Sequence, residues 1–166
     1  ANVLVTGAGA HHLTGELVTD VSTASRSLVT DLSTGEWDGE LLELFGLADE
    51  RMPRILANDE MAGTTAAFGG DVPVGGLVVD QQAALLAQRC LAPGEAKCTF
   101  GTGAFLLANV GARPRLSRSG LTTSVAWRVR GGTAYCVDGQ VFTAASAARW
   151  LQDLGLVASA AELDAV

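Results

Sequence analysis

The fold of the chain is constrained most by residues 74–88, where a short apolar run passes directly into a helix-forming run. Residues 75–79 are glycine, leucine and valine, which is typical of a buried strand. Residues 81–88 are glutamine, alanine and leucine, which favour a helix. Asp80 stands between the two runs, where open α/β folds bind their ligands, but a short acceptor side chain is also a common helix N-cap. The pattern predicts an α/β chain and leaves both roles open for Asp80.

Length and charge limit the function classes. The chain has 166 residues, which at roughly 100–200 residues per domain is one domain or parts of two. Its net charge of −7 argues against a nucleic-acid surface, which needs clustered positive charge. No apolar run reaches the ~18 residues that span a bilayer, and the N-terminus lacks the pattern of a signal peptide. We therefore expect a cytoplasmic chain that binds neither nucleic acid nor membrane.

The cysteines do not form a recognised pattern. Cys90, Cys98 and Cys136 are odd in number, widely spaced and without a CxxC pair. This predicts reduced thiols, with neither a disulfide framework nor a structural zinc site. No metal ligands are predicted.

The first residues invite a dinucleotide-binding interpretation. Residues 3–10 are predicted as a short buried strand followed by a glycine turn, and a strand that runs into G-x-G can seat a pyrophosphate. The third small residue of that fingerprint is replaced by His12. An ordinary strand and turn is therefore the favoured prediction.

The rest of the first half alternates short elements. Residues 19–26 predict an ordered loop or helix start, because Asp20, Ser22 and Thr23 can bond to nearby backbone groups. A strand is expected within residues 27–31 and a helix over residues 39–47. The apolar stripe of that helix consists of Leu41, Leu42, Leu44 and Phe45. The polar, glycine-rich residues 58–72 predict a hairpin or an exposed connection.

Short strands dominate the second half. Residues 96–100 and 104–110 are predicted strands joined by Gly101-Thr102-Gly103, a turn whose amides and hydroxyl can hold phosphate oxygens or simply reverse the chain. Residues 121–130 and 133–137 predict a second hairpin, and residues 142–154 an alanine-rich helix.

Together these segments resemble the FGGY carbohydrate kinases, and among them the glycerol kinases most. The resemblance is carried by Leu13-Thr14-Gly15, residues 19–26, Trp37-Asp38, Leu41-Leu42, residues 80–85, Pro93-Gly94, Ala96-Lys97, residues 100–103, Asp138-Gly139, Val141-Phe142 and Trp150-Leu151. It covers the chain from about His12 to Asp153. The sequence Asp-Gln-Gln-Ala-Ala-Leu, followed later by Gly-Thr-Gly, is its most specific part.

The resemblance implies an actin-like ATPase (ribonuclease H-like) α/β fold of which this chain is a piece. Residues 1–88 would be the C-terminal part of the first, substrate-side domain, and residues 89–166 the N-terminal part of the second, nucleotide-side domain. The family members are about three times as long, so the isolated piece is expected to be inactive. A homo-oligomer is also expected.

The resemblance also implies roles for individual residues. Asp80 corresponds to the general base that takes the proton of a substrate hydroxyl as it attacks the γ-phosphoryl group of ATP, and Gln81 to a residue that binds the polyol. Thr102 and Gly103 correspond to the turn beside the ATP phosphates. The implied cofactors are ATP and Mg²⁺, and the implied reaction is phosphorylation of glycerol or a related polyol.

Three positions depart from the family pattern. Ala145 and Arg149, at nucleotide-binding positions, replace a usual glycine and a glutamine, and Val79 replaces a glycine before the catalytic carboxylate. These departures imply a divergent member. Two alternatives therefore stand beside the polyol kinase: another sugar kinase of this architecture, acting on a ketose or polyol, and a non-catalytic nucleotide-binding relative.

Overall fold

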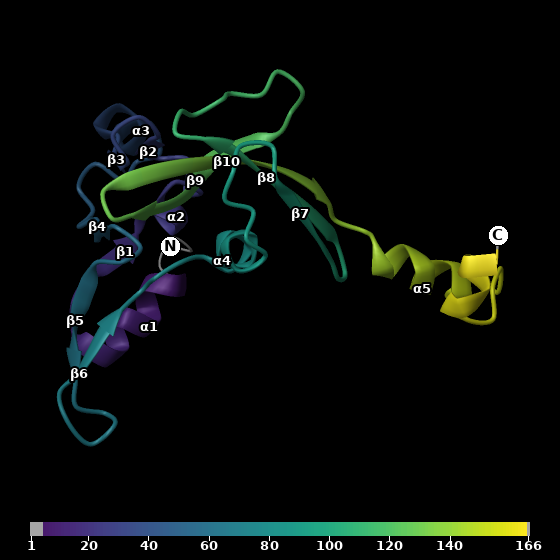
Figure 1. The fold of residues 1–166 in the computed structure, drawn as a ribbon, viewed down its shortest axis with the longest axis horizontal. Helices are drawn as coiled ribbons and strands as arrows, with labels where there is room; N and C mark the ends of the chain where they lie inside the picture. The colour runs from purple at the N-terminus through teal and green to yellow at the C-terminus, as the bar shows by residue number, and fades with distance from the viewer. Residues whose placement is uncertain (1–4, 166) are drawn as a thin grey trace.

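The computed structural model describes residues 5–165, which form two parts joined side by side, with a helix that extends away from them (Figure 1). The first part is a set of short elements. They are α1 (Val5–Thr14), β1 (Val18–Asp20), α2 (Val21–Ala24), β2 (Thr30–Asp31), β3 (Glu36–Trp37), α3 (Gly39–Leu44), β4 (Arg54–Leu56), β5 (Met61–Thr65) and β6 (Val72–Gly75). Strands β1 and β4 pair in parallel, whereas β2–β3 and β5–β6 are antiparallel pairs.

The predicted strand at the N-terminus is wrong for the residues that can be described. Residues 5–10 belong to α1, and Ala10 is buried with Val18, Leu56 and Ala62. A short apolar run cannot be assigned to strand or helix by periodicity alone, and here the run is helical with Ala10 packed into the buried cluster. Residues 3 and 4 lie outside the described residues. Among the residues that the structure describes, Gly7 and Gly9 lie within a helix and no strand runs into them.

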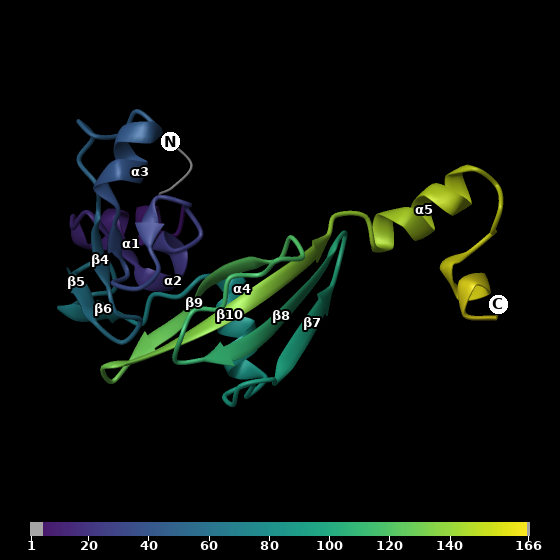
Figure 2. The same ribbon diagram turned by 90° about the horizontal axis from the view of Figure 1, so that it is seen from above.

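The second part is built on a four-stranded antiparallel sheet. Its elements are α4 (Asp80–Ala87), β7 (Ala96–Phe100), β8 (Ala104–Gly111), β9 (Thr122–Val129), β10 (Gly132–Val141), α5 (Ala145–Asp153) and a 3₁₀ helix, η2 (Ala160–Ala165). The strand order is β7-β8-β10-β9. Helix α4 packs on the sheet, and their shared core consists of Leu85, Cys90, Leu107, Ala126 and Cys136. Seen from above, the sheet lies between the first part and α5 (Figure 2).

The two parts meet where α2 packs on β9. Val21, Val125 and Tyr135 form a buried cluster at this junction. The Val125 backbone N–H donates to Ser25 Oγ at 2.9 Å. Arg26 Nη1 lies 2.5 Å from Asp138 Oδ2, in an ion pair whose carboxylate is almost fully buried. The junction therefore has both an apolar core and specific polar contacts.

Most predicted elements are confirmed. The two hairpins of the second half and the hairpin within residues 58–75 are present, and α5 begins at Ala145, three residues later than expected. Helix α3 is present, but Leu44 and Phe45 of its stripe are exposed. The predicted strand over residues 75–79 is wrong. Strand β6, which pairs with β5, ends at Gly75. Gly76 has a φ of +75°, and the chain turns away from the β5–β6 pair at this residue.

All three cysteines are free, with Cys90 and Cys136 buried and Cys98 exposed. Within residues 5–165, no helix combines the length and the apolar character needed to cross a bilayer.

Candidate active site

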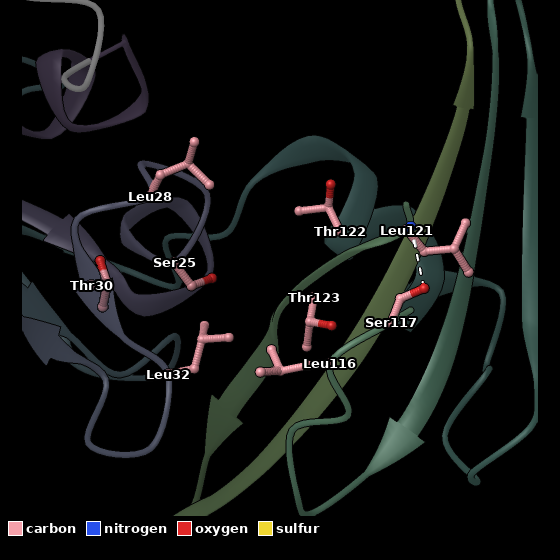
Figure 3. A pocket seen from close by; sticks show the side chains of 9 residues that line it. All are labelled: Ser25, Leu28, Thr30, Leu32, Leu116, Ser117, Leu121, Thr122 and Thr123. Atoms are coloured by element: carbon pink, nitrogen blue, oxygen red, sulfur yellow. Dashed lines mark hydrogen bonds between the residues drawn. The ribbon is translucent and has the colours of Figure 1, made fainter. Parts of the chain in front are cut away.

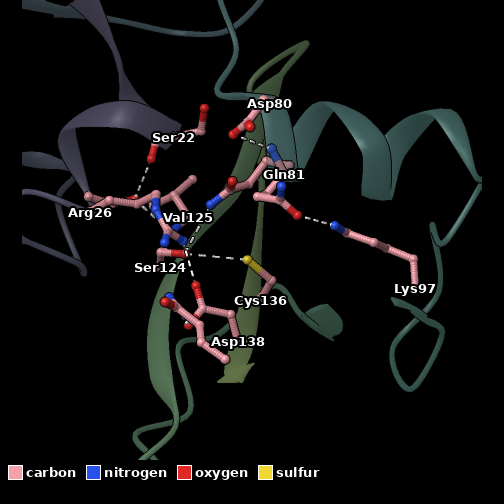
Figure 4. Close-up of polar contacts among 12 residues, drawn as sticks. Ser22, Arg26, Asp80, Gln81, Lys97, Ser124, Val125, Cys136 and Asp138 are labelled. Atoms are coloured by element: carbon pink, nitrogen blue, oxygen red, sulfur yellow. Dashed lines mark hydrogen bonds and ion pairs between the residues drawn. The ribbon is translucent and has the colours of Figure 1, made fainter. Parts of the chain in front are cut away.

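Asp80 and Gln81 open helix α4 at the junction of the two parts (Figure 4). The N-cap position belongs to Val79, which has extended backbone angles and no capping side chain. Asp80 is the first helical residue and its side chain is exposed. Its Oδ1 accepts a hydrogen bond from the Gln81 backbone N–H at 2.8 Å. The N-cap interpretation of Asp80 is therefore wrong, and the carboxylate stands at the helix N-terminus, where negative charge is favoured.

The approach to Asp80 is held by polar side chains of the first part. The Val79 backbone N–H donates to Ser22 Oγ at 3.1 Å. The Asn58 amide Nδ2 donates to the Leu77 carbonyl at 2.7 Å. These bonds replace the strand pairing that residues 76–79 lack, and so they fix the position at which α4 begins.

Asp20 is the centre of the network that holds Ser22 and Asn58. Its carboxylate is buried and accepts hydrogen bonds from the Ser22 hydroxyl, from the Thr23 backbone at 3.1 Å, from Thr23 Oγ1 at 2.6 Å and from Asn58 Nδ2 at 3.0 Å. It is also the N-cap of α2. The predicted capping role of this segment is confirmed, and the saturated carboxylate serves the structure.

Lys97 approaches Gln81 from strand β7. Its ammonium donates to Gln81 Oε1 and to Thr99 Oγ1, the latter at 2.7 Å. Burial holds the pKa of Lys97 below its ordinary value, while the Asp80 carboxylate acts in the opposite direction. Sequence reasoning assigned no role to this residue. The available signal was that the chain contains a single lysine, placed within a short alternating strand.

Gln82 points away from the site, into the core. Its Nε2 donates to Ser124 Oγ at 3.2 Å, and its buried Oε1 has no hydrogen-bond partner among the described residues. Ser124 Oγ lies 3.4 Å from Cys136 Sγ, and burial raises the pKa of that thiol. The two adjacent glutamines thus have different surroundings: Gln81 meets Lys97 and Gln82 meets the sheet.

The turn at residues 101–103 lies against the start of α5. The backbone N–H of Ala144 donates to the Thr102 carbonyl at 2.8 Å, and that of Ala145 donates to the Gly101 carbonyl at 3.1 Å. A Cβ on Gly103 would lie 2.7 Å from the Val141 carbonyl oxygen, so glycine is required there by the chain itself. The structure thus brings Thr102, Gly103 and Ala145 together.

Arg149 lies one helical turn beyond Ala145. Both side chains are exposed, and residues four apart share one face of a helix. The Thr102 side chain, in the turn that contacts the start of α5, is also exposed.

A surface hollow of about 410 Å³ lies elsewhere, between the segment after α2 and the start of β9 (Figure 3). It is lined by Ser25, Leu28, Thr30, Leu32, Leu116, Ser117, Leu121, Thr122 and Thr123. None of the residues predicted from the sequence to bind substrate or nucleotide lines it. Within the described part of the chain, no three His, Cys, Asp or Glu side chains gather in a way that would hold a metal ion.

Comparisons with known proteins show which sequences this chain is similar to. Residues 10–87 match the sequence model of the N-terminal domain of the FGGY family of carbohydrate kinases. The glycerol kinase of Alkalilimnicola ehrlichii is 44% identical over 152 residues, which is 90% of this chain and 31% of that protein. Over residues 10–87 the chain is therefore similar to the FGGY family of carbohydrate kinases, and its similarity to glycerol kinases extends over most of its length. A second relative, the glycerol kinase of Thermus brockianus, is 43% identical over 93% of this chain and 32% of its own length.

Solved structures of FGGY kinases have the same fold. The glycerol kinase of Plasmodium falciparum with ADP superimposes with a TM-score of 0.86 at 32% identity, over 92% of this chain and 32% of that one. A xylulose kinase from Brucella ovis gives 0.79 at 26% identity, over 93% of this chain and 32% of that one. The predicted actin-like α/β fold is confirmed. The chain spans about a third of the length of the relatives it matches.

Proposed function

We propose that this chain is the central part of a kinase that transfers the γ-phosphoryl group of ATP to glycerol or a related polyol. The observation that supports this most is the exposed Asp80 carboxylate at the first residue of α4, beside Gln81. The identity of 44% and 43% to two glycerol kinases supports glycerol over a ketose.

Asp80 would act as the general base. Its carboxylate accepts the proton of one substrate hydroxyl as that oxygen forms a bond to the γ-phosphorus, while the bond between the γ-phosphorus and the bridging oxygen breaks and ADP leaves. Its Oδ2 has no hydrogen-bond donor among the described residues, which leaves that oxygen for the hydroxyl. Phosphoryl transfer depends mainly on such alignment and on neutralising charge.

The nucleotide would lie along the turn at residues 101–103 and the exposed face of α5. Thr102 offers an exposed hydroxyl, and Arg149 offers a guanidinium that can pair with phosphate. Gly103 lets the turn pack against the Val141 carbonyl and so keeps Thr102 in place. Ala145 is exposed next to the turn, so its methyl group stands where the nucleotide would pass.

Mg²⁺ fits this site as a companion of ATP. The ion prefers oxygen ligands and is commonly held by one or two carboxylates together with substrate phosphates. Asp80 would be such a carboxylate, and the phosphate oxygens of the nucleotide would supply further ligands. When bound, the ion neutralises charge on the phosphates.

We also propose the division of the chain at residue 88, with residues 1–88 on the substrate side and residues 89–166 on the nucleotide side. The family match, which ends at residue 87, supports this boundary. Asp80 and Gln81 then come from the first domain, and Thr102, Gly103, Ala145 and Arg149 from the second.

A chimeric kinase tests the function. Residues of this chain replace the matched third of the Thermus brockianus glycerol kinase, and ADP release is followed with glycerol, other polyols and ketoses. Asp80→Asn in this chimeric kinase is expected to lower kcat by at least about 100-fold, the usual contribution of a general base. ATP binding, measured by calorimetry, is expected to be unchanged.

Asp71→Asn, an exposed aspartate beside β6, is the matched control and should keep full activity. Turnover by Asp80→Asn equal to that of the unsubstituted chimera would refute the base assignment. A folded chimera that binds ATP but phosphorylates no compound in the panel would favour the non-catalytic alternative. Activity on a ketose alone would retain the fold and change the substrate.

A further inference from the structure

Lys97 is buried without a carboxylate partner. Its residue is 3% exposed, whereas Ala96 and Cys98 on either side are exposed. Among the described residues the ion pairs are Arg26–Asp138 and Arg54–Glu60, so Lys97 has none. Burying an ammonium group costs free energy unless the group is paired or hydrogen-bonded. The hydrogen-bond acceptors of the Lys97 ammonium are Gln81 Oε1 and Thr99 Oγ1.

This contact determines the orientation of the Gln81 amide. An ammonium has donors and no acceptor, so the Gln81 atom that faces it must be the oxygen. The amino group, Nε2, then faces the opposite way, and it has no protein acceptor among the described residues. Gln81 thus presents two N–H donors at the N-terminus of α4, next to the Asp80 carboxylate, which only accepts hydrogen bonds.

The pair matches two hydroxyl groups of one polyol. One hydroxyl donates its proton to Asp80, and a second hydroxyl accepts a hydrogen bond from Gln81 Nε2. If the amide were reversed, its oxygen would face the substrate and would compete with Asp80 for hydroxyl protons. The orientation therefore affects how tightly the polyol is held beside the base.

We propose that Lys97 is a positioning residue of the site, which holds the Gln81 amide with its amino group toward the substrate. The inference rests on the proposed polyol kinase function. Lys97 touches neither substrate nor nucleotide in this proposal; it acts through Gln81. Thr99 accepts the second hydrogen bond and so directs the ammonium.

The test is Lys97→Met in the chimeric kinase, because methionine keeps the length of the stem and loses the donors. The KM for glycerol is expected to rise roughly tenfold, the worth of one well-oriented hydrogen bond. The KM for ATP and kcat are expected to stay within about twofold, since uniform substrate binding is lost and the base remains.

A double-substitution cycle separates positioning from a merely structural effect. Gln81→Ala alone should raise the KM for glycerol, and adding Lys97→Met should raise it no further. Leu56→Val, a core substitution in the other part of the fold, controls for lost stability and should leave this KM unchanged. An equal effect of Lys97→Met with and without Gln81 would overturn the proposal, as would an unchanged KM.

Two further outcomes are distinguishable. Where Lys97→Met does not fold, Thr99→Val removes one acceptor of the ammonium and should raise the same KM by a smaller factor; no change would overturn the inference. Loss of activity in Asp80→Asn combined with a normal KM in Lys97→Met would refute the role of Lys97 alone. Full activity in Asp80→Asn would instead refute the base assignment, and a folded chimera that phosphorylates no polyol would refute the proposed function.

Discussion

The backbone N–H of Val79 donates to Ser22 Oγ at 3.1 Å, across 57 residues of sequence. The residue that precedes the candidate base is thereby attached to the first turn of α2. Asn58 adds a second attachment through the Leu77 carbonyl. The position of Asp80 therefore depends on side chains that touch no substrate.

Asn58 is the residue on which these contacts depend most. Its amide donates to Asp20 and Leu77, and its Oδ1 accepts from the Arg128 backbone at 2.7 Å. Asn58→Ala leaves these buried partners unsatisfied, so the free energy of unfolding of the 166-residue chain should fall by about 2–3 kcal/mol. Urea unfolding measures this. The exposed substitution Asp49→Ala should change it by less than about 0.5 kcal/mol, and equal losses in the two variants would contradict the prediction.

The turn at residues 101–103 offers a matched pair of glycines. A Cβ on Gly103 would lie 2.7 Å from the Val141 carbonyl oxygen, whereas on Gly101 the nearest atom is 3.9 Å away. Gly103→Ala should therefore lower the free energy of unfolding by about 1–3 kcal/mol, and Gly101→Ala by much less. Urea unfolding of both variants is the measurement, and similar values would argue against the close packing of this turn on β10.

The ion pair between Arg26 and Asp138 is expected to matter for stability. Arg26→Ala leaves a buried carboxylate unpaired and should cost about 2 kcal/mol. Arg54→Ala breaks the exposed pair with Glu60 and should cost less than about 1 kcal/mol. Unfolding in low and high salt compares the two; a cost for Arg26→Ala no larger than that for Arg54→Ala would mean that the junction does not depend on this pair.

Lys97 should titrate below the ordinary lysine pKa of 10.5. Because it is the only lysine, its side-chain NMR resonance in the lysine-labelled chain needs no assignment. The groups that act on it are Asp80, Cys98 and Cys136, which raise its pKa, and Arg26, which lowers it along with burial. Asp80→Asn should therefore lower the pKa further, and a rise would contradict the arrangement of α4 and β7.

The lowered pKa of Lys97 also makes the free energy of unfolding depend on pH. Between the folded pKa of Lys97 and 10.5, the unfolded chain holds the proton that the folded chain has lost. The contribution of this lysine to the free energy of unfolding therefore increases with pH in that window. Urea unfolding of the unsubstituted chain and of Lys97→Met, at several pH values in this range, measures the contribution. The free energy of unfolding of the unsubstituted chain should rise with pH relative to that of Lys97→Met.

Local patterns predicted the hairpins, α4 and α5, because their signals lie within a few neighbouring residues. The strand expected before Asp80 was wrong because residues 76–79 are held by Ser22 and Asn58, partners that no local pattern indicates. Lys97 was missed for the same reason: its acceptor Gln81 lies sixteen residues away on another element. The strand predicted over residues 5–10 was wrong because a short apolar run is compatible with either a strand or a buried helix.

The order of strands has a consequence for how the chain folds. Strands β7–β8 and β9–β10 are joined by short turns, and such hairpins form within about 1–10 μs. The Ser25–Val125 contact joins residues 100 apart, and such distant closures come late. Pulsed hydrogen exchange should protect the β8 and β10 amides before the Val125 amide, and the reverse order would contradict this. The surroundings of Asp80, at the junction of the two parts, would then form only after each part has formed its own strands and helices.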